Sequence, residues 1–162
     1  MTDSIDPASA FAWQEGSWQV RHRKLRERLA GCGDWAEFGG TCTAWPVLGG
    51  RGNVEDNRID DPGGAYHAIA VRSFDAASGL WSIWWLDGRS PSAIDVPVRG
   101  RFEDGVGVFL AEDQWHGAPV TIRFRWSGIT ADSARWEQAF SADGGASWEV
   151  NWVMDFTRVA AA

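Results

Sequence analysis

The sequence predicts an all-β protein, a single antiparallel up-and-down β-barrel of about ten strands with a short N-terminal helical arm. Short runs of β-forming residues alternate with clusters of Gly, Asp and Pro at barrel-like spacing. The loops are too short for crossover helices, so neighbouring strands are antiparallel, and closing the sheet removes its exposed edges. Twelve tryptophans and eight phenylalanines exceed what the core of one domain needs, so some rings are expected to line a cavity.

The chain divides into an arm, a barrel and a tail. In the arm, residues 1–12, Asp6-Pro7 can start a turn of helix. The barrel is expected over residues 13–158 and the tail over 159–162, and no repeat or linker suggests a second domain. The expected strands are Ser17–Arg26, Trp35–Pro46, Asn53–Ile59, Ala65–Phe74, Leu80–Leu86, Val98–Glu103, Val106–Glu112, Pro119–Ser127, Ala134–Phe140 and Trp148–Thr157.

Two segments have a second interpretation. Residues 21–28 are strongly basic and also fit an amphipathic helix, but a solvated strand with carboxylate neighbours is preferred. The Asp-Gly-Gly turn at 143–145 is the strongest hairpin signal. The surrounding Ser141-x-Asp143-x-Gly145-x-Ser147-Trp148 resembles the Asp box of sialidase propellers. A sialidase needs several such boxes and this chain has one, so it is interpreted as a turn device in which the carboxylate satisfies loop amides.

Composition narrows the classes of partner. The net charge of -7 argues against nucleic acid or an anionic membrane, both of which favour a basic surface, and favours a small-molecule ligand. The sequence shows no signal peptide and no apolar run of membrane-spanning length, which favours the cytoplasm. Cys32 and Cys42 lack CxxC spacing, and the three histidines lack ligand spacing, so neither a metal site nor a cofactor is expected. A homodimer stays open.

The first and last strands carry a family resemblance. Gly16-Ser17-Trp18, the hairpin order and the terminal Arg158 together resemble the calycin superfamily of lipocalin-like and fatty-acid-binding-like barrels. The stretches at 100–105 and 135–141 look like an uncharacterised bacterial family related to DUF1579. The resemblance implies that Trp18 closes one end of the barrel and that Arg158 lies across it, which suits stacking of a guanidinium on an indole.

Alternation of side chains selects candidate site residues. If Trp18 points inward, His22 and Lys24 do so too, and His22 is the leading acid–base candidate. On the polar strand 53–58, one face carries Glu55 and Asn57, and which face is inward stays open. The other candidate pocket residues are Arg72, Trp84, Trp85, Trp126, Trp136, Gln138 and Trp152.

The same alternation of inward and outward side chains applies to the two strands of the last hairpin. An inward Arg158 places Trp152 inside and leaves Asn151 and Asp155 outside unless a bulge shifts the register. Glu137 then faces outward, where it is expected to pair with Arg123 or Arg125.

Three functions fit these candidates. The preferred one is a cytosolic barrel that binds a mainly hydrophobic metabolite in an aromatic-lined cavity with a few polar groups. The alternative is a cofactor-free isomerase, cyclase or hydratase of a bulky secondary-metabolite-like substrate, with His22 and Glu55 as its catalytic residues. The third is a haem-binding barrel resembling nitrobindin, which requires an inward histidine able to ligate iron.

Overall fold

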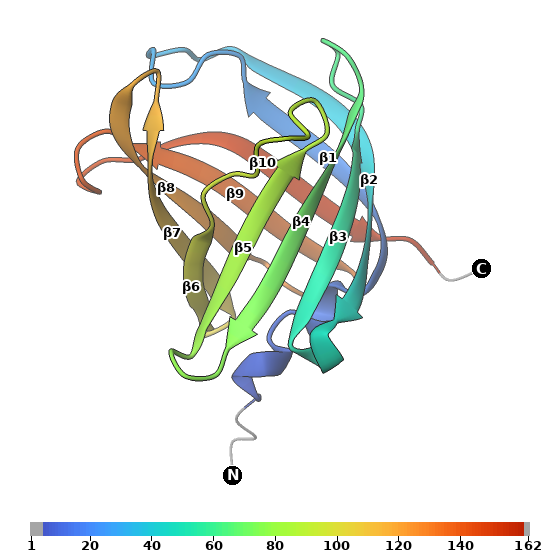
Figure 1. Cartoon of the computed structure of the whole chain (residues 1–162). Helices are drawn as coiled ribbons and strands as arrows, with labels where there is room; N and C mark the ends of the chain where they lie inside the picture. Colours follow the sequence, from blue (N-terminus) through green and yellow to red (C-terminus); the bar gives the residue numbers. More distant parts are fainter. Residues whose placement is uncertain (1–4, 161–162) are drawn as a thin grey trace.

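Ten antiparallel strands close into a barrel in the computed structural model, which describes residues 5–160 (Figure 1). The strand order is β1-β10-β9-β8-β7-β6-β5-β4-β3-β2, so each strand pairs with its chain neighbours and β1 pairs with β10 to close the sheet. The strands are β1 Gly16–Leu25, β2 Trp35–Val47, β3 Gly52–Ile59, β4 Tyr66–Asp75, β5 Leu80–Asp87, β6 Val98–Glu103, β7 Val106–Trp115, β8 Ala118–Ser127, β9 Ser133–Ser141 and β10 Glu149–Arg158.

The predicted all-β barrel is confirmed strand by strand. β7 runs three residues beyond its predicted end at Glu112, and every other strand end lies within one residue of the prediction. The basic segment 21–28 continues β1 as far as Leu25, so the amphipathic helix does not form. Turn-forming residues set these boundaries, because Gly, Asp and Pro clusters end the β-forming runs.

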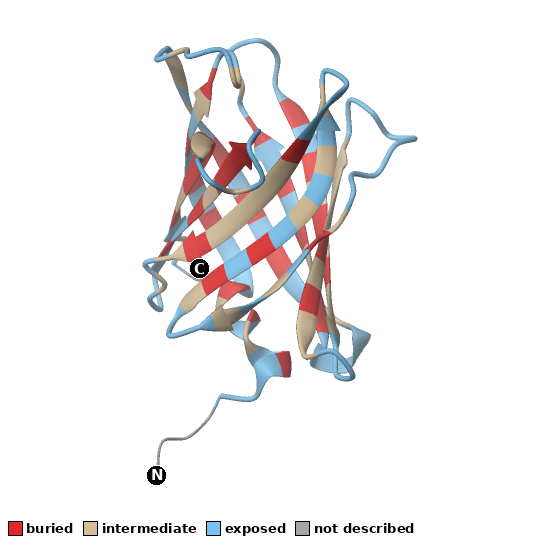
Figure 2. Ribbon diagram, turned by 90° about the vertical axis from the view of Figure 1, so that its left-hand side faces the viewer, coloured by how far each residue is buried: buried red, intermediate tan, exposed pale blue. Residues whose placement is uncertain are grey.

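Buried and exposed residues alternate along the strands, as Figure 2 shows in red and pale blue. On β1, Trp18, Val20 and His22 are buried while the residues between them are exposed. On β3 the inward face carries Glu55 and Asn57, which answers the question that alternation alone left open. The barrel interior therefore contains polar groups deep inside an otherwise aromatic core.

The N-terminal segment folds as two 3-10 helices, η1 Pro7–Ser9 and η2 Ala12–Gln14, at the end of the barrel where β4 ends and β5 begins (Figure 1). A third, η3 Leu48–Gly50, follows β2. The Phe11 ring is only 2% exposed and packs edge-on against Trp81 and Phe102, with centroid distances of 5.0 and 4.9 Å. Residues 7–14 are therefore a plug that completes the core, and we call them the N-terminal plug.

The β9–β10 hairpin is held by its single Asp box. The Asp143 carboxylate accepts hydrogen bonds from the Ser147 amide at 2.8 Å and from the Ser147 hydroxyl at 2.5 Å. The Ser141 hydroxyl donates to the same carboxylate at 2.7 Å and accepts from the Gly145 amide at 2.8 Å. These bonds, led by that of the Ser147 hydroxyl, lower the pKa of Asp143 to about 2. The box acts as a turn device.

Candidate functional site

At the end of the barrel that holds the N-terminal plug, Arg158 stacks on Trp18 and donates hydrogen bonds to backbone carbonyl groups. The Arg158 guanidinium lies 4.2 Å from the centre of the Trp18 ring. Its three nitrogens donate to the carbonyl oxygens of Ala131 at 2.7 Å, Glu15 at 2.6 Å and Trp13 at 2.6 Å. Arg158 thus ties the plug and the β8–β9 loop to the last strand, and this pair has an architectural role.

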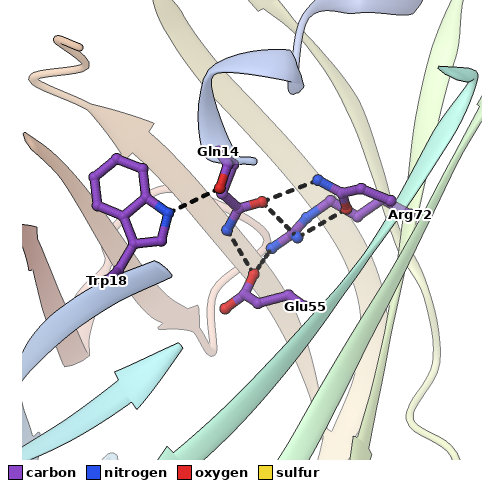
Figure 3. Close-up of polar contacts among 5 residues, drawn as sticks. Gln14, Trp18, Glu55 and Arg72 are labelled. Atoms are coloured by element: carbon purple, nitrogen blue, oxygen red, sulfur yellow. Dashed lines mark hydrogen bonds and ion pairs between the residues drawn. The ribbon is translucent and has the colours of Figure 1, made fainter. Parts of the chain in front are cut away.

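A polar network lies directly beneath the plug (Figure 3). The Gln14 side-chain amide donates to Glu55 Oε2 at 2.7 Å, and its carbonyl oxygen accepts from Arg72 Nη1 at 2.8 Å and Asn53 Nδ2 at 3.1 Å. Arg72 also pairs with Glu55, and both side chains are 3% exposed. The Gln14 main-chain oxygen accepts from the Trp18 indole at 2.8 Å. One plug residue therefore connects β1, β3 and β4.

Glu55 is a charged structural group in this network. Burial by itself raises the pKa of Glu55, but the Arg72 charge and its hydrogen bonds outweigh burial and hold that pKa below its ordinary value. The carboxylate is already engaged by Arg72 and Gln14. Neighbouring Asn57 is 1% exposed, and its side chain has no hydrogen-bond partner among residues 5–160. This geometry leaves Glu55 without access to a substrate.

His22 is sealed in the wall of the barrel. Its Nδ1 accepts a hydrogen bond from the Trp152 indole at 3.1 Å, and its ring stacks on Phe38 at a centroid distance of 5.0 Å. On the other side, a Cβ at Gly40 would lie only 2.9 Å from His22 Nε2. Burial, reinforced by the Lys24 charge, lowers the pKa of His22 to about 4, so the ring is neutral at pH 7.

The end of the barrel opposite the plug opens into a cavity of about 320 Å³, which we call the mouth pocket. Its apolar wall consists of Trp85, Phe124, Trp136 and Trp152. Its polar and small lining residues are Lys24, Arg28, Tyr66, Asp87, Arg89, Ser90, Ala93, Asp95 and Gln138. They come from β1, β4, β5, β9 and the loops after β1 and β5, which the barrel brings to one end. A cavity of this size that combines an aromatic wall with oriented polar groups is a typical small-ligand site.

The polar rim of this pocket is rich in positive charge. Arg89 is held by Asp87 with an N–O distance of 2.7 Å, and its guanidinium lies 3.6 Å from the centre of the Tyr66 ring. Lys24 and Arg28 form no ion pair with any residue of the described part of the chain. Burial lowers the pKa of Arg28 and raises that of Asp95. The rim therefore holds two cations that a ligand anion can neutralise.

The structure brings together some of the sequence-derived candidates. Lys24, Trp85, Trp136, Gln138 and Trp152 line the mouth pocket. Other candidates lie elsewhere. Arg72 and Trp126 line a small inner space on the far side of the aromatic wall. Asn57, His22 and Glu55 are buried and do not line the mouth pocket.

Trp84 requires a correction. It was expected in the cavity, but it lies on the outer face, because it pairs with Val71 while the next residue, Trp85, points inward against Trp152. Adjacent residues of a regular strand face opposite sides of the sheet, so only one of the two tryptophans can reach the lumen.

The alternation of inward and outward side chains also gave the wrong side for Asn151, near the start of β10. A register shift between Val150 and Trp152 buries both Asn151 and Trp152, although alternation had placed Asn151 outside. Asn151 accepts a hydrogen bond from the Gln138 amide at 2.8 Å and so fixes that side chain beside the pocket. A bulge puts an extra residue into one strand, and no turn signal in the sequence announces this one.

The sequence analysis did not single out several residues that the structure places in the polar network or in the mouth pocket. Gln14, just after the predicted arm, was not singled out, and Arg28, Tyr66 and Arg89 lie in or beside loops whose convergence only the closed barrel creates. No pattern in the sequence singles these four residues out.

Within residues 5–160, no group of three or more His, Cys, Asp or Glu side chains is arranged to hold a metal ion. None of the helices in that range has the length and hydropathy needed to cross a membrane.

Comparison with known proteins supports the fold. No protein-family model matches the chain, and no curated protein matches it. Among solved structures it is similar to the S-type phycobiliprotein lyase CPES from Guillardia theta, with a TM-score of 0.59 and 11% identity over 94% of this chain and 92% of that chain. A likeness at this identity concerns the fold alone. The chain therefore has a calycin-like, lipocalin-type barrel of ten strands closed at one end by its own N-terminal plug.

Proposed function

We propose that this protein binds a small amphipathic molecule in the mouth pocket, with a flat apolar body against the aromatic wall and an anionic group at the rim. The observation that carries this proposal is the pocket itself, about 320 Å³ with tryptophans on its wall and unpaired cations at its edge. Ligand sites commonly combine an apolar cavity of this size with a few oriented polar groups.

The aromatic wall suits a flat body. The rings of Trp85 and Trp136 stand nearly perpendicular to that of Trp152, at interplanar angles of 87° and 88° and centroid distances of 5.9 and 5.4 Å. Edge-to-face packing fixes these rings in place. A conjugated or aromatic ligand gains dispersion and apolar burial against them without reordering the wall.

The rim supplies affinity for an anionic group. Arg28 is partly withdrawn from water and has no carboxylate partner among the described residues, and Lys24 is in the same situation. A carboxylate or sulfonate between them makes charge-assisted hydrogen bonds, for which a planar guanidinium is well shaped.

The two other functions have less support. The cofactor-free enzyme relied on His22 and Glu55, but neither lines the pocket and both are engaged by neighbouring side chains. Haem ligation relied on the same histidine, whose Nδ1 already accepts the Trp152 indole hydrogen and whose other face is packed against Gly40. These residues do not fit a haem ligand.

Three earlier expectations stay predictions. Relationship to the DUF1579-related family rests on the Gly16-Ser-Trp18 motif, the terminal Arg158 and the stretches at 100–105 and 135–141. The cytoplasm and a homodimer are likewise proposed from the sequence. The structural likeness to a phycobiliprotein lyase is compatible with a conjugated ligand and does not name it.

A pair of probes tests the proposed function. 1-Anilinonaphthalene-8-sulfonate has an aromatic body and an anionic group, and N-phenyl-1-naphthylamine has the same body without the charge. We expect both to bind and to quench tryptophan emission. Arg28→Ala should weaken sulfonate binding about tenfold or more, the effect of losing a hydrogen bond between charged groups worth about 1.5–3 kcal/mol.

Two controls sharpen the test. Arg28→Ala should leave the affinity for the neutral probe within about twofold, because that probe has no group for the guanidinium to bind. Arg101→Ala removes an outer-face arginine whose side chain is 59% exposed and should change neither affinity. Absence of binding by the wild-type protein, or equal sulfonate affinity in wild type and Arg28→Ala, would refute the proposal.

A further inference from the structure

Lys24 is the only lysine of the chain, and all other Lys and Arg positions are arginine. The two residues differ in one chemical respect that matters here. A guanidinium stays protonated at any physiological pH, whereas a buried ammonium can lose its proton and become a nucleophile. Lys24 is therefore the single side chain of the sequence that can supply a neutral amine.

That position is the centre of the open end of the barrel. Lys24 lines the mouth pocket and also the two hollows beside it, one of about 620 Å³ towards Trp115 and one of about 350 Å³ towards Phe38. Its Nζ lies 4.3 Å from the centre of the Trp152 ring and donates to the Tyr66 hydroxyl at 3.5 Å. Within the described residues no carboxylate lies within ion-pair distance of it.

The surroundings favour the neutral amine. The pKa of Lys24 is lowered to about 8, first by burial and then by the Arg28 and Arg89 charges. The Asp61 and Asp87 charges raise it, but more weakly. At pH 7.5 about a quarter of the side chain is then neutral, against about 0.1% for an ordinary lysine with a pKa near 10.4. Asp95, also in the pocket, does not reach Nζ as an ion pair.

We propose that Lys24 captures a conjugated or aromatic aldehyde in the mouth pocket as a reversible imine. This inference rests on the proposed function, since the aromatic wall holds the body of the aldehyde, and it names the chemical class of ligand. Such an aldehyde places its apolar body against Trp136 and Trp152 and its carbonyl carbon beside Nζ.

The reaction is a condensation without oxidation or reduction. The amine lone pair attacks the carbonyl carbon, a C–N bond forms, and the oxygen takes up the proton that nitrogen gives up. The C–O bond of this carbinolamine then breaks, the oxygen leaves as water after a second protonation, and nitrogen forms the C=N bond. That second proton comes from solvent at the open end of the barrel; the Tyr66 hydroxyl, whose pKa burial raises to about 12, stays protonated and accepts the Nζ hydrogen bond at 3.5 Å. The protonated imine lies over the Trp152 face, where a cation is stabilised.

Reductive trapping tests this inference. The protein is incubated at pH 7.5 with 2-naphthaldehyde and sodium cyanoborohydride, which reduces an imine to a stable secondary amine. Intact mass spectrometry and peptide mapping then follow the adduct. We expect one rapidly formed adduct on Lys24, and its loss in K24R, which leaves only the slower reaction of the N-terminal amine.

The matched control moves the lysine to the outer face. K24R/R101K again has one lysine, at a strand position whose side chain is 59% exposed. We expect trapping at least about tenfold slower than in wild type, and still rising above pH 9, whereas the wild-type rate levels off above about pH 8. Near-ultraviolet circular dichroism shows whether each variant retains the packed barrel.

The outcomes separate the two proposals. Equal trapping rates for Lys24 and the exposed lysine, or an adduct on the N-terminus alone, would overturn the imine proposal while anilinonaphthalene sulfonate still binds to the wild type. Failure of both naphthalene probes to bind would overturn the proposed function first, and the imine proposal with it.

Discussion

Replacing Arg72 with methionine removes the guanidinium that neutralises Glu55 beneath the plug. Both side chains are 3% exposed, so the carboxylate is left in the core with Gln14 as its hydrogen-bond donor at 2.7 Å. Breaking a buried ion pair by removing one partner costs about 3–5 kcal/mol, because an uncompensated charge stays buried. Since a domain of this kind is stable by about 5–15 kcal/mol, the loss is a large fraction of the total.

The assay is urea unfolding at pH 7 followed by tryptophan emission, with free energies from linear extrapolation. We expect Arg72→Met to lower the free energy of unfolding by about 3–5 kcal/mol. Arg101→Met, at an outer-face position 59% exposed, should change it by less than about 0.5 kcal/mol.

The pH dependence of the unfolding free energy gives a second test of the Glu55–Arg72 pair. In the wild type the folded-state pKa of Glu55 is lowered, so its stabilisation is present above the ordinary pKa of 4.5 and is lost as pH falls through the folded value. Without Arg72, burial dominates and raises the folded pKa of Glu55, so the destabilisation is full at neutral pH and is relieved on acidification. The difference in unfolding free energy between wild type and Arg72→Met should therefore narrow from pH 7 to pH 5.

A double variant decides whether charge is the cause. Glu55→Gln combined with Arg72→Met removes both charges, and we expect it to be more stable than Arg72→Met alone. The reasoning fails if the double variant is at least as destabilised as the sum of the two single ones, or if Arg72→Met costs less than about 1 kcal/mol.

Two further predictions concern the close backbone packing at Gly40 and the three hydrogen bonds of Arg158. Gly40→Ala should lower the unfolding free energy by about 1–3 kcal/mol, because its methyl group would overlap the carbonyl oxygen of Arg58, whereas Gly39→Ala meets its nearest atom only at 4.0 Å and should be neutral in the same urea assay. Arg158→Lys should cost about 2–4 kcal/mol, because one ammonium cannot reach the three carbonyl oxygens now bound at 2.6–2.7 Å; an unchanged melting temperature would contradict this role.

Local pattern was sufficient for the architecture. Residues 120–126 alternate apolar and polar side chains, and the Asp143 turn joins two such runs, so strand order and antiparallel pairing follow from short-range chemistry. The same alternation correctly put Trp18, His22 and Lys24 on one face of β1.

The sequence pattern was insufficient at a bulge, and where it did not show which face of a strand is inward. The bulge in β10 buried Asn151, and the choice between Trp84 and Trp85 required knowing which face of β5 was inward. Alternation says that two residues face opposite ways and leaves open which of them is inside.

The sequence by itself determined the ten strands, their order, the closed sheet and the aromatic excess, because these depend on neighbours within a few residues of one another. Only the tertiary structure decided the sites. It brought Gln14 from the N-terminal plug to Glu55 and Arg72, and it brought Lys24, Arg28 and Arg89 from separate loops and strands to one rim. The physical reason is that burial and charge at these groups depend on long-range contacts, which exist only once the barrel has closed.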